Sequence, residues 1–140
     1  MNSKDRGLSI SLSISLMRAV PDAPTAVDWY KRAIDATELW NLGTVVGLEV
    51  DGAPFFLAQP AGHGWDSPAA IGTTTARIEV FVDDPDSFVE RAVQAGATGI
   101  IDGIQDHQTP WGKHRQGGFH DPFGHLWLVG DRSPLRRLPS

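Results

Sequence analysis

Histidine is the residue type in this chain that is best suited to bind a metal ion or to move a proton near neutral pH. Four of the five histidines fall in the second half, with spacings of seven, six and five, and they are His107, His114, His120 and His125. These spacings match none of the compact patterns of metal sites. Because His125 and Trp127 fall on one face of an expected strand, we interpret His125 as a packed, hydrogen-bonded core residue. A metal site built in an unusual way from these histidines, with His63, stays open as the alternative.

Two charged residues share one face of another expected strand. Arg77 and Glu79 are two positions apart, so their side chains point to the same side of the sheet. The guanidinium of Arg77 could bind a carboxylate or phosphoryl group of a ligand. Glu79 is the only candidate for a general base, provided that it is desolvated. The alternative is that the two residues only satisfy each other as an ion pair.

Aromatic side chains favour a binding function. Trp40 and Trp111 lie near expected strand ends and loops, while Phe55 and Phe119 lie on hairpin strands. An apolar cleft with flat rings and few polar groups suits planar or drug-like ligands. Trp29 lies in the middle of an expected helix, so we assign it to the core.

The segment near the N-terminus alternates strictly between apolar residues and serine. From Leu8 to Leu16, every second residue is serine and the others are leucine or isoleucine. This period of two predicts a strand with one apolar and one polar face. The stretch is too short to span a membrane, and no small-x-small cleavage site follows before Pro21. We therefore expect a cytoplasmic protein.

The composition limits the class of protein. The chain has 140 residues, of which 41% are hydrophobic and 21% charged, as in a globular protein of one domain. A net charge of -5 argues against a nucleic-acid or anionic-membrane partner, because both require a positive surface. The absence of cysteine excludes disulfides, thiolate metal sites and a cysteine nucleophile.

The chain contains one pattern written twice. At an offset of 62, four positions of the first half match four of the second, namely Ser15 with Arg77, Val20 with Val82, Asp22 with Asp84 and Val27 with Val89. Each half is expected to contain a strand, a helix, a strand and a hairpin. The expected helices cover Thr25 to Ile34, with Thr25 as the cap, and Asp86 to Gln94. Between the later strands, residues 106–116 have the character of an inserted loop.

This repeat sets the expected organisation. Unit one covers about 8–60, a joining loop about 61–72, unit two about 73–131 and a tail 132–140. A single unit of this kind cannot bury both faces of its sheet. We therefore predict one α+β domain in which two tandem βαβββ units form a curled mixed sheet around a shared cleft.

The closing motif carries a family resemblance. Asp121-Pro122-Phe123-Gly124 has the residues of a type I turn, and His125-Leu126-Trp127 continues into a strand. Together with Trp111-Gly112 upstream, this segment resembles the glyoxalase/bleomycin-resistance/dioxygenase superfamily, also called vicinal oxygen chelate proteins. It is most similar to the bacterial branch that carries Asp-Pro-Phe-Gly-His-x-Trp. The resemblance covers about residues 8 to 131 and implies the same paired fold.

The resemblance also says where a metal ion would lie. In the metal-using members, the ligands come from the first and last strand of each unit. The matching positions here are Ser15, Leu57, Arg77 and Leu128. Leucine cannot coordinate a metal ion and a guanidinium repels it, so we expect no metal or other cofactor. One divalent ion held by a different set of residues is the alternative.

These observations predict a metal-independent small-molecule binding protein that sequesters an aromatic or antibiotic-like ligand. The expected ligand-binding residues are Ser15, Trp40, Phe55, Leu57, Arg77, Glu79, Trp111, Phe119 and Leu128. A homodimer is expected, because a second chain commonly completes the cleft in the resembled family. One alternative is a metal-dependent lyase, isomerase or dioxygenase with a non-standard ligand set. A weaker one is a regulatory module whose cleft is only a dimer seam.

Overall fold

The computed structural model describes residues 12–62 and 64–136, so His63 lies outside the described part of the chain. The first unit contains β1 (Met17–Ala19), α2 (Ala23–Ile34), β2 (Thr37–Asn41), β3 (Val45–Val50) and β4 (Ala53–Ala58). After the short helix α3 (Pro68–Ile71), the second unit contains β5 (Arg77–Phe81), α4 (Pro85–Gln94), β6 (Thr98–Thr109), β7 (Gly112–His120) and β8 (Leu126–Gly130), followed by the 3-10 helix η1 (Ser133–Leu135). The two tandem βαβββ units of the predicted α+β fold are therefore confirmed.

The two units have the same strand order. Their sheets run β1-β4-β3-β2 and β5-β8-β7-β6, and in each the first strand is parallel to the last. Met17 pairs with Phe56 in the first sheet, and Glu79 pairs with Leu128 in the second. Met17 and Glu79 are 62 positions apart, so the offset read from the sequence is the offset of the structure.

Both long helices begin at an aspartate. The carboxylate of Asp22 accepts a hydrogen bond from the backbone N–H of Thr25 at 3.0 Å, and that of Asp84 accepts one from Ser87 at 3.1 Å. This satisfies backbone donors that have no partner inside the helix. The cap of the first helix is thus Asp22 and not Thr25, because the helix begins two residues earlier than predicted.

Two other expectations about strands are wrong. The first strand begins at Met17, and residues 12–16 form none, since exposed Leu12 and Ile14 have no sheet face to pack on. Residues 8–11 lie outside the described part. Conversely, the expected loop 106–116 is mostly strand, because β6 and β7 pair up to Thr109 and Gly112. Pro110 and Trp111 close this hairpin tightly, and Gly112 takes a φ of 114° that favours glycine.

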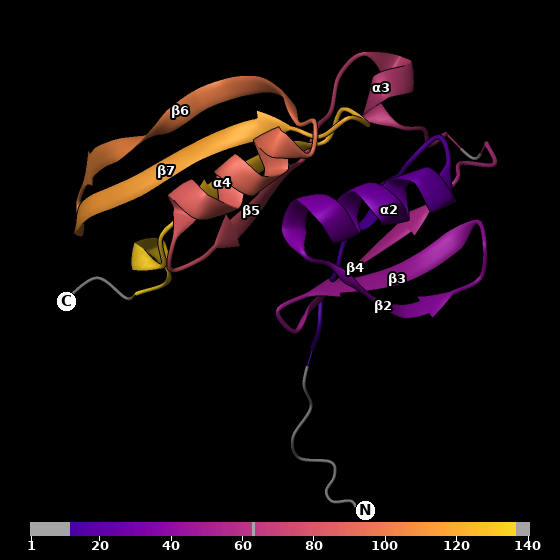
Figure 1. Cartoon of the computed structure of the whole chain (residues 1–140), viewed down its shortest axis with the longest axis horizontal. Helices are drawn as coiled ribbons and strands as arrows, with labels where there is room; N and C mark the ends of the chain where they lie inside the picture. Colours follow the sequence, from indigo (N-terminus) through magenta and orange to yellow (C-terminus); the bar gives the residue numbers. More distant parts are fainter. Residues whose placement is uncertain (1–11, 63, 137–140) are drawn as a thin grey trace, which may run out of the picture.

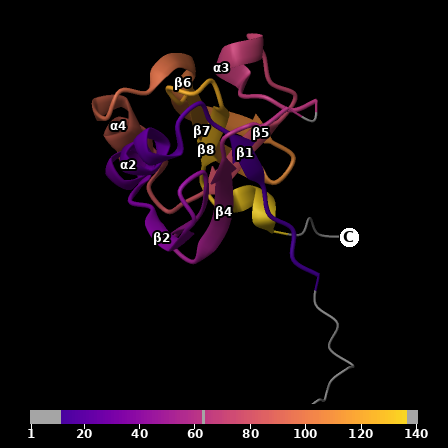
Figure 2. The same ribbon diagram turned by 90° about the vertical axis from the view of Figure 1, so that its right-hand side faces the viewer.

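Helices α2 and α4 lie together on one side of the molecule, and strands β1, β4, β5 and β8 lie on the other (Figures 1 and 2). One apolar core spans both units and contains the rings of Tyr30 and Phe55 from unit one and of Phe123 and Trp127 from unit two. Helix α2 contacts α4, and the indole N–H of Trp29 donates to the carbonyl of Ala95 at 2.8 Å. In the described part of the chain, no helix has the length and apolar character needed to cross a bilayer.

Candidate functional site

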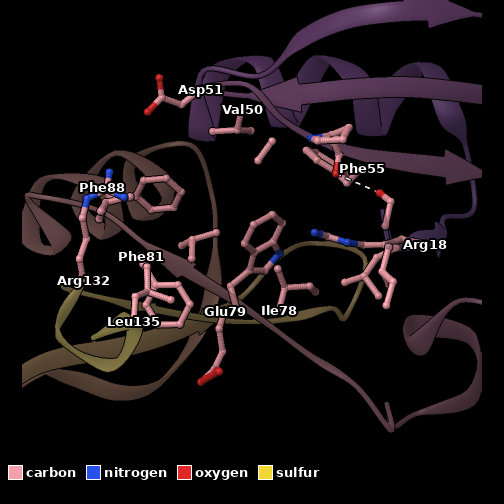
Figure 3. Close-up of a pocket in the computed structure, with 18 residues that line it drawn as sticks. Arg18, Val50, Asp51, Phe55, Ile78, Glu79, Phe81, Phe88, Arg132 and Leu135 are labelled. Carbon is pink, nitrogen blue, oxygen red and sulfur yellow. Dashed lines mark hydrogen bonds between the residues drawn. The ribbon is translucent and has the colours of Figure 1, made fainter. Parts of the chain in front are cut away.

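A cavity of about 440 Å³ lies between the two units. Unit one contributes the segment before β1, the guanidinium of Arg18 and the β3–β4 hairpin, including Phe55. Unit two contributes β5, Phe88 of α4 and the residues around η1. The walls are mainly apolar, and Figure 3 shows Arg18 extending from its strand into the space between Phe55 and Ile78. Its size lies within the range of small-molecule sites.

Arg18 forms the buried end of this cavity. Its side chain is 4% exposed, and the guanidinium carbon lies 4.0 Å from the centre of the Trp127 ring and 4.7 Å from that of Phe55. These are cation–π contacts with the faces of the rings. Nε and Nη1 of Arg18 are buried and have no hydrogen-bond partner. Burial lowers the pKa of Arg18, while the nearby Tyr30 and Asp121 oppose this effect.

Asp121 is a buried acceptor that joins the two units. Its carboxylate accepts the backbone N–H groups of Phe123 at 2.9 Å and His125 at 3.0 Å. It also accepts the indole N–H of Trp127 at 2.9 Å and the hydroxyl of Tyr30 from helix α2. Burial, reinforced by the negative charge of Asp121, raises the pKa of Tyr30 well above its usual value. Tyr30 therefore stays a neutral hydrogen-bond donor.

The interpretation of His125 as a packed core residue is confirmed. Its side chain is buried, and Nε2 lies 2.8 Å from the carbonyl oxygen of Ala19 in the other unit. Burial lowers the pKa of His125, although the charge of Asp121 acts in the opposite direction. A neutral imidazole that donates to a carbonyl is a structural link between the units.

His114 takes part in a second polar cluster that resembles a catalytic triad only in composition. Its Nδ1 lies 2.7 Å from a carboxylate oxygen of Asp131 and 3.0 Å from the hydroxyl of Ser133. Burial would raise the pKa of Asp131, but hydrogen bonds from Arg115, Ser133 and His114 hold it well below its usual range. Because serine and aspartate contact the same ring nitrogen, no proton relay from Ser133 through the ring to Asp131 can form. Trp111 donates to Ser133 at 2.9 Å, so the cluster fastens the tip of the β6–β7 hairpin to η1.

The predicted ligand-binding residues do not form one group. Ser15, Phe55 and Glu79 line the cavity, but the carboxylate of Glu79 points away from the labelled side chains around it (Figure 3). Glu79 is also exposed, so it lacks the desolvation that a general base was expected to have. Ser15 uses its hydroxyl to donate to the carbonyl of Pro54 at 3.0 Å. Trp111 is at the hairpin tip, outside the cavity.

The other predicted residues divide between the open sheet faces and the core. Trp40, Arg77 and Leu128 lie on faces that none of the described helices covers, and Trp40 stacks on Phe56 with ring centres 5.6 Å apart. Leu57 and Phe119 are fully buried on the helix side of their sheets, so their predicted place on the wall of a cleft is wrong. Phe56, and not Leu57, is the partner of Met17 and therefore the counterpart of Leu128. A slip of one residue moves a side chain to the opposite face.

The corrected register does not produce a metal site at the position that the family resemblance implies. The residues that face each other there are Met17 with Phe56 and Glu79 with Leu128; Met17 and Glu79 lie two positions along the chain from the predicted Ser15 and Arg77. One carboxylate beside a thioether, a phenyl ring and an isobutyl group does not fit a divalent ion, which requires several oxygen or nitrogen ligands. In addition, no three His, Asp or Glu side chains come together as a metal-binding group in the described part of the chain.

Sequence reasoning missed Arg18, although a signal was present. Arg18 lies two positions after Leu16 and two before Val20, so it falls on the apolar face of the predicted alternation. A charged residue in an apolar phase is rarely buried without a partner. Arg18 was therefore a candidate for a special environment.

Comparison with known proteins places the geometry in context. The sequence model of the glyoxalase-like domain matches residues 15–129. An uncharacterised protein of Mycobacterium bovis is 32% identical over 141 aligned positions, which cover 94% of this chain and 89% of the relative. The crystal structure of TioX from a Micromonospora species matches with a TM-score of 0.68 and 28% identity, covering 86% of this chain and 98% of TioX. The fosfomycin resistance protein FosX from Mesorhizobium loti matches with a TM-score of 0.58 and 16% identity, covering 86% and 91%.

Proposed function

Because this chain belongs to the glyoxalase-like domain family, we propose that it binds a planar aromatic, antibiotic-like small molecule in the cavity between its two units. The observation that carries this proposal is the cavity of about 440 Å³, which has aromatic and aliphatic walls and few polar groups. Such a lining binds a flat apolar ligand by excluding water from both surfaces. The protein then sequesters the ligand and leaves it chemically unchanged.

We further propose that this binding needs no metal ion. The support is the chemistry of the residues at the equivalent strand positions, where Met17, Phe56 and Leu128 accompany a single carboxylate, Glu79. The likeness to FosX shows the fold alone at 16% identity, so the ligand class rests on the cavity.

A homodimer is the third part of the proposal. The open face of the first sheet exposes Met17 and Trp40, and all five residues of β2 are exposed. Exposed apolar side chains grouped on one face indicate an interaction surface. A second copy of the chain, placed on this face, would cover it by a symmetric contact.

The test is a titration with a planar aromatic probe such as 2-naphthamide, followed by Trp fluorescence and native mass spectrometry. Val80→Phe should weaken binding about tenfold or more, because the added ring fills the cavity that Val80 lines. Val93→Phe is the matched control, since Val93 is exposed on α4 and does not line the cavity. The bound probe should be recovered unchanged, and a chelator should have no effect. Conversion of the probe, or binding that a chelator abolishes, would contradict this proposal.

A further inference from the structure

The geometry points to an anionic ligand: we infer that the molecule bound in the inter-unit cavity carries a carboxylate, which the guanidinium of Arg18 binds. This inference rests on the proposed function, because it identifies the chemical class of the same ligand. It assigns a role to a residue that neither the repeat nor the closing motif explains.

The unused donors of Arg18 are the first step. A guanidinium has five N–H donors in one plane and no acceptor. The rings of Trp127 and Phe55 lie 4.0 and 4.7 Å from its central carbon and offer no hydrogen-bond acceptor, so the side-chain hydrogen bond with Tyr30 leaves Nε and Nη1 unpaired. Nε and Nη1 have no hydrogen-bond partner, although Arg18 is only 4% exposed. Buried donors of this kind are nearly always paired.

The neighbouring carboxylate does not supply the missing acceptor. Asp121 already accepts hydrogen bonds from Phe123, His125, Trp127 and Tyr30. Its negative charge stabilises the cation of Arg18 at a distance, yet its lone pairs are used by other donors. No residue of the described part of the chain accepts a hydrogen bond from Nε or Nη1, so these two donors are available to a bound ligand.

The remaining charges of the cavity lie elsewhere. Figure 3 shows Asp51 and Arg132 on the far side from Arg18, and the carboxylate of Glu79 turned away. Arg132 is already paired with Asp83 at 2.9 Å. Among the described residues that line the cavity, Arg18 is therefore the arginine without a carboxylate partner, and apolar walls that include Phe88 and Val80 lie beyond it.

This arrangement fits an amphiphilic monoanion. The two oxygens of a carboxylate match the planar fork of a guanidinium, and the buried surroundings strengthen the interaction. A phosphate dianion would place two negative charges beside one cation, so a carboxylate is the better match. The aromatic body of the ligand would then occupy the apolar remainder of the cavity.

Two probes of the same shape test the inference, namely 2-naphthoate and its neutral amide, 2-naphthamide. The wild-type protein should bind naphthoate at least about tenfold more tightly. Arg18→Met should remove this preference, and Arg18→Lys should restore only part of it, because lysine lacks the planar fork. Arg77→Met, which removes an exposed arginine from β5, should keep the wild-type preference.

The outcomes separate the two proposals. If neither probe binds, the proposed function fails together with the inference. If both bind with equal affinity to the wild type, the cavity is a binding site but its ligand is not an anion. If Arg18→Met does not fold, the side-chain N–H spectrum of the wild-type protein decides. Naphthoate should shift the Arg18 Nε–H signal and naphthamide should not, and an unmoved signal with bound naphthoate would overturn the role of Arg18.

Discussion

At the scale of single residues, the most connected side chain is a carboxylate in a turn. Asp121 is 1% exposed and accepts hydrogen bonds from its own turn, from β8 and from helix α2 of the other unit. The sequence motif around it therefore has a structural role. It fixes the turn between β7 and β8 and at the same time joins the units.

His125 makes the stability of the protein dependent on pH. Burial lowers its pKa in the folded state below the value of about 6.5 of an unfolded chain, while Asp121 opposes and Arg18 assists this effect. Below pH 6.5 the His125 imidazole therefore binds a proton more readily in the unfolded chain than in the folded protein. We expect the free energy of unfolding to fall as the pH drops from 7.5 to 5, by at most about 1.4 kcal/mol per pH unit from this residue. Urea unfolding at several pH values measures this, and His125→Gln should flatten the slope; an unchanged slope would contradict the assignment.

At the scale of elements, close strand packing in the second sheet depends on glycine. A side-chain carbon at Gly118 of β7 would lie 2.7 Å from the carbonyl oxygen of Trp127 and 2.9 Å from Leu128. At Gly103 of β6 it would meet nothing within 4 Å. A backbone atom cannot move aside as a flexible side chain can. Alanine therefore does not fit at position 118 without a shift of the strands.

We expect Gly118→Ala to destabilise the protein by about 1–3 kcal/mol, because it overpacks the β7–β8 pair. Gly103→Ala is the matched control in the neighbouring strand and should change stability by less than about 0.5 kcal/mol. Chemical denaturation of both variants gives the comparison. Equal effects of the two substitutions would show that the β7–β8 spacing is not the limiting contact.

At the scale of the whole molecule, the open sheet faces determine the expected assembly. A dimer should have a mass of about 30 kDa, twice the 15.2 kDa of one chain, in analytical ultracentrifugation. Trp40→Glu should shift the equilibrium toward the monomer, because it puts a charge on the open face of the first sheet. Trp65→Glu is the control, since Trp65 is equally exposed, 39% against 40%, but lies in the joining segment. A monomeric wild-type protein would contradict the dimer.

Much of the fold could be predicted because its signals are local or repeated. The offset of 62, the turn at Asp121 and the ends of both helices within two residues follow from turn chemistry and periodicity. The β6–β7 hairpin was missed because its polar, glycine-containing sequence has no alternating pattern, and its pairing comes from tertiary contacts. Localisation in the cytoplasm and the Asp-Pro-Phe-Gly-His-x-Trp branch stay predictions.

The site was predicted less well, for reasons that individual residues show. Leu57 was assigned to the cleft by a register one residue off, which no local pattern around β4 could correct. Phe119 was assigned to a ligand for its aromatic character, although it stacks on Trp127 in the core. Arg18 was missed because the two rings nearest to its guanidinium, Phe55 and Trp127, lie more than 35 residues away in the sequence.

The buried carboxylate of Asp121 also affects the order in which the protein opens. Tight turns usually exchange their amide protons with solvent early, because water reaches their N–H groups directly. Here the amides of Phe123 and His125 are bound to a side chain in the core, and the Phe123 carbonyl accepts from Ala69 of α3. We expect these amides to be exposed to deuterium only when Asp121 leaves its buried position, where Tyr30 of the other unit also holds it. This turn should therefore keep its protons about as long as the central strands, and hydrogen exchange at two loop positions would report the global unfolding of the chain.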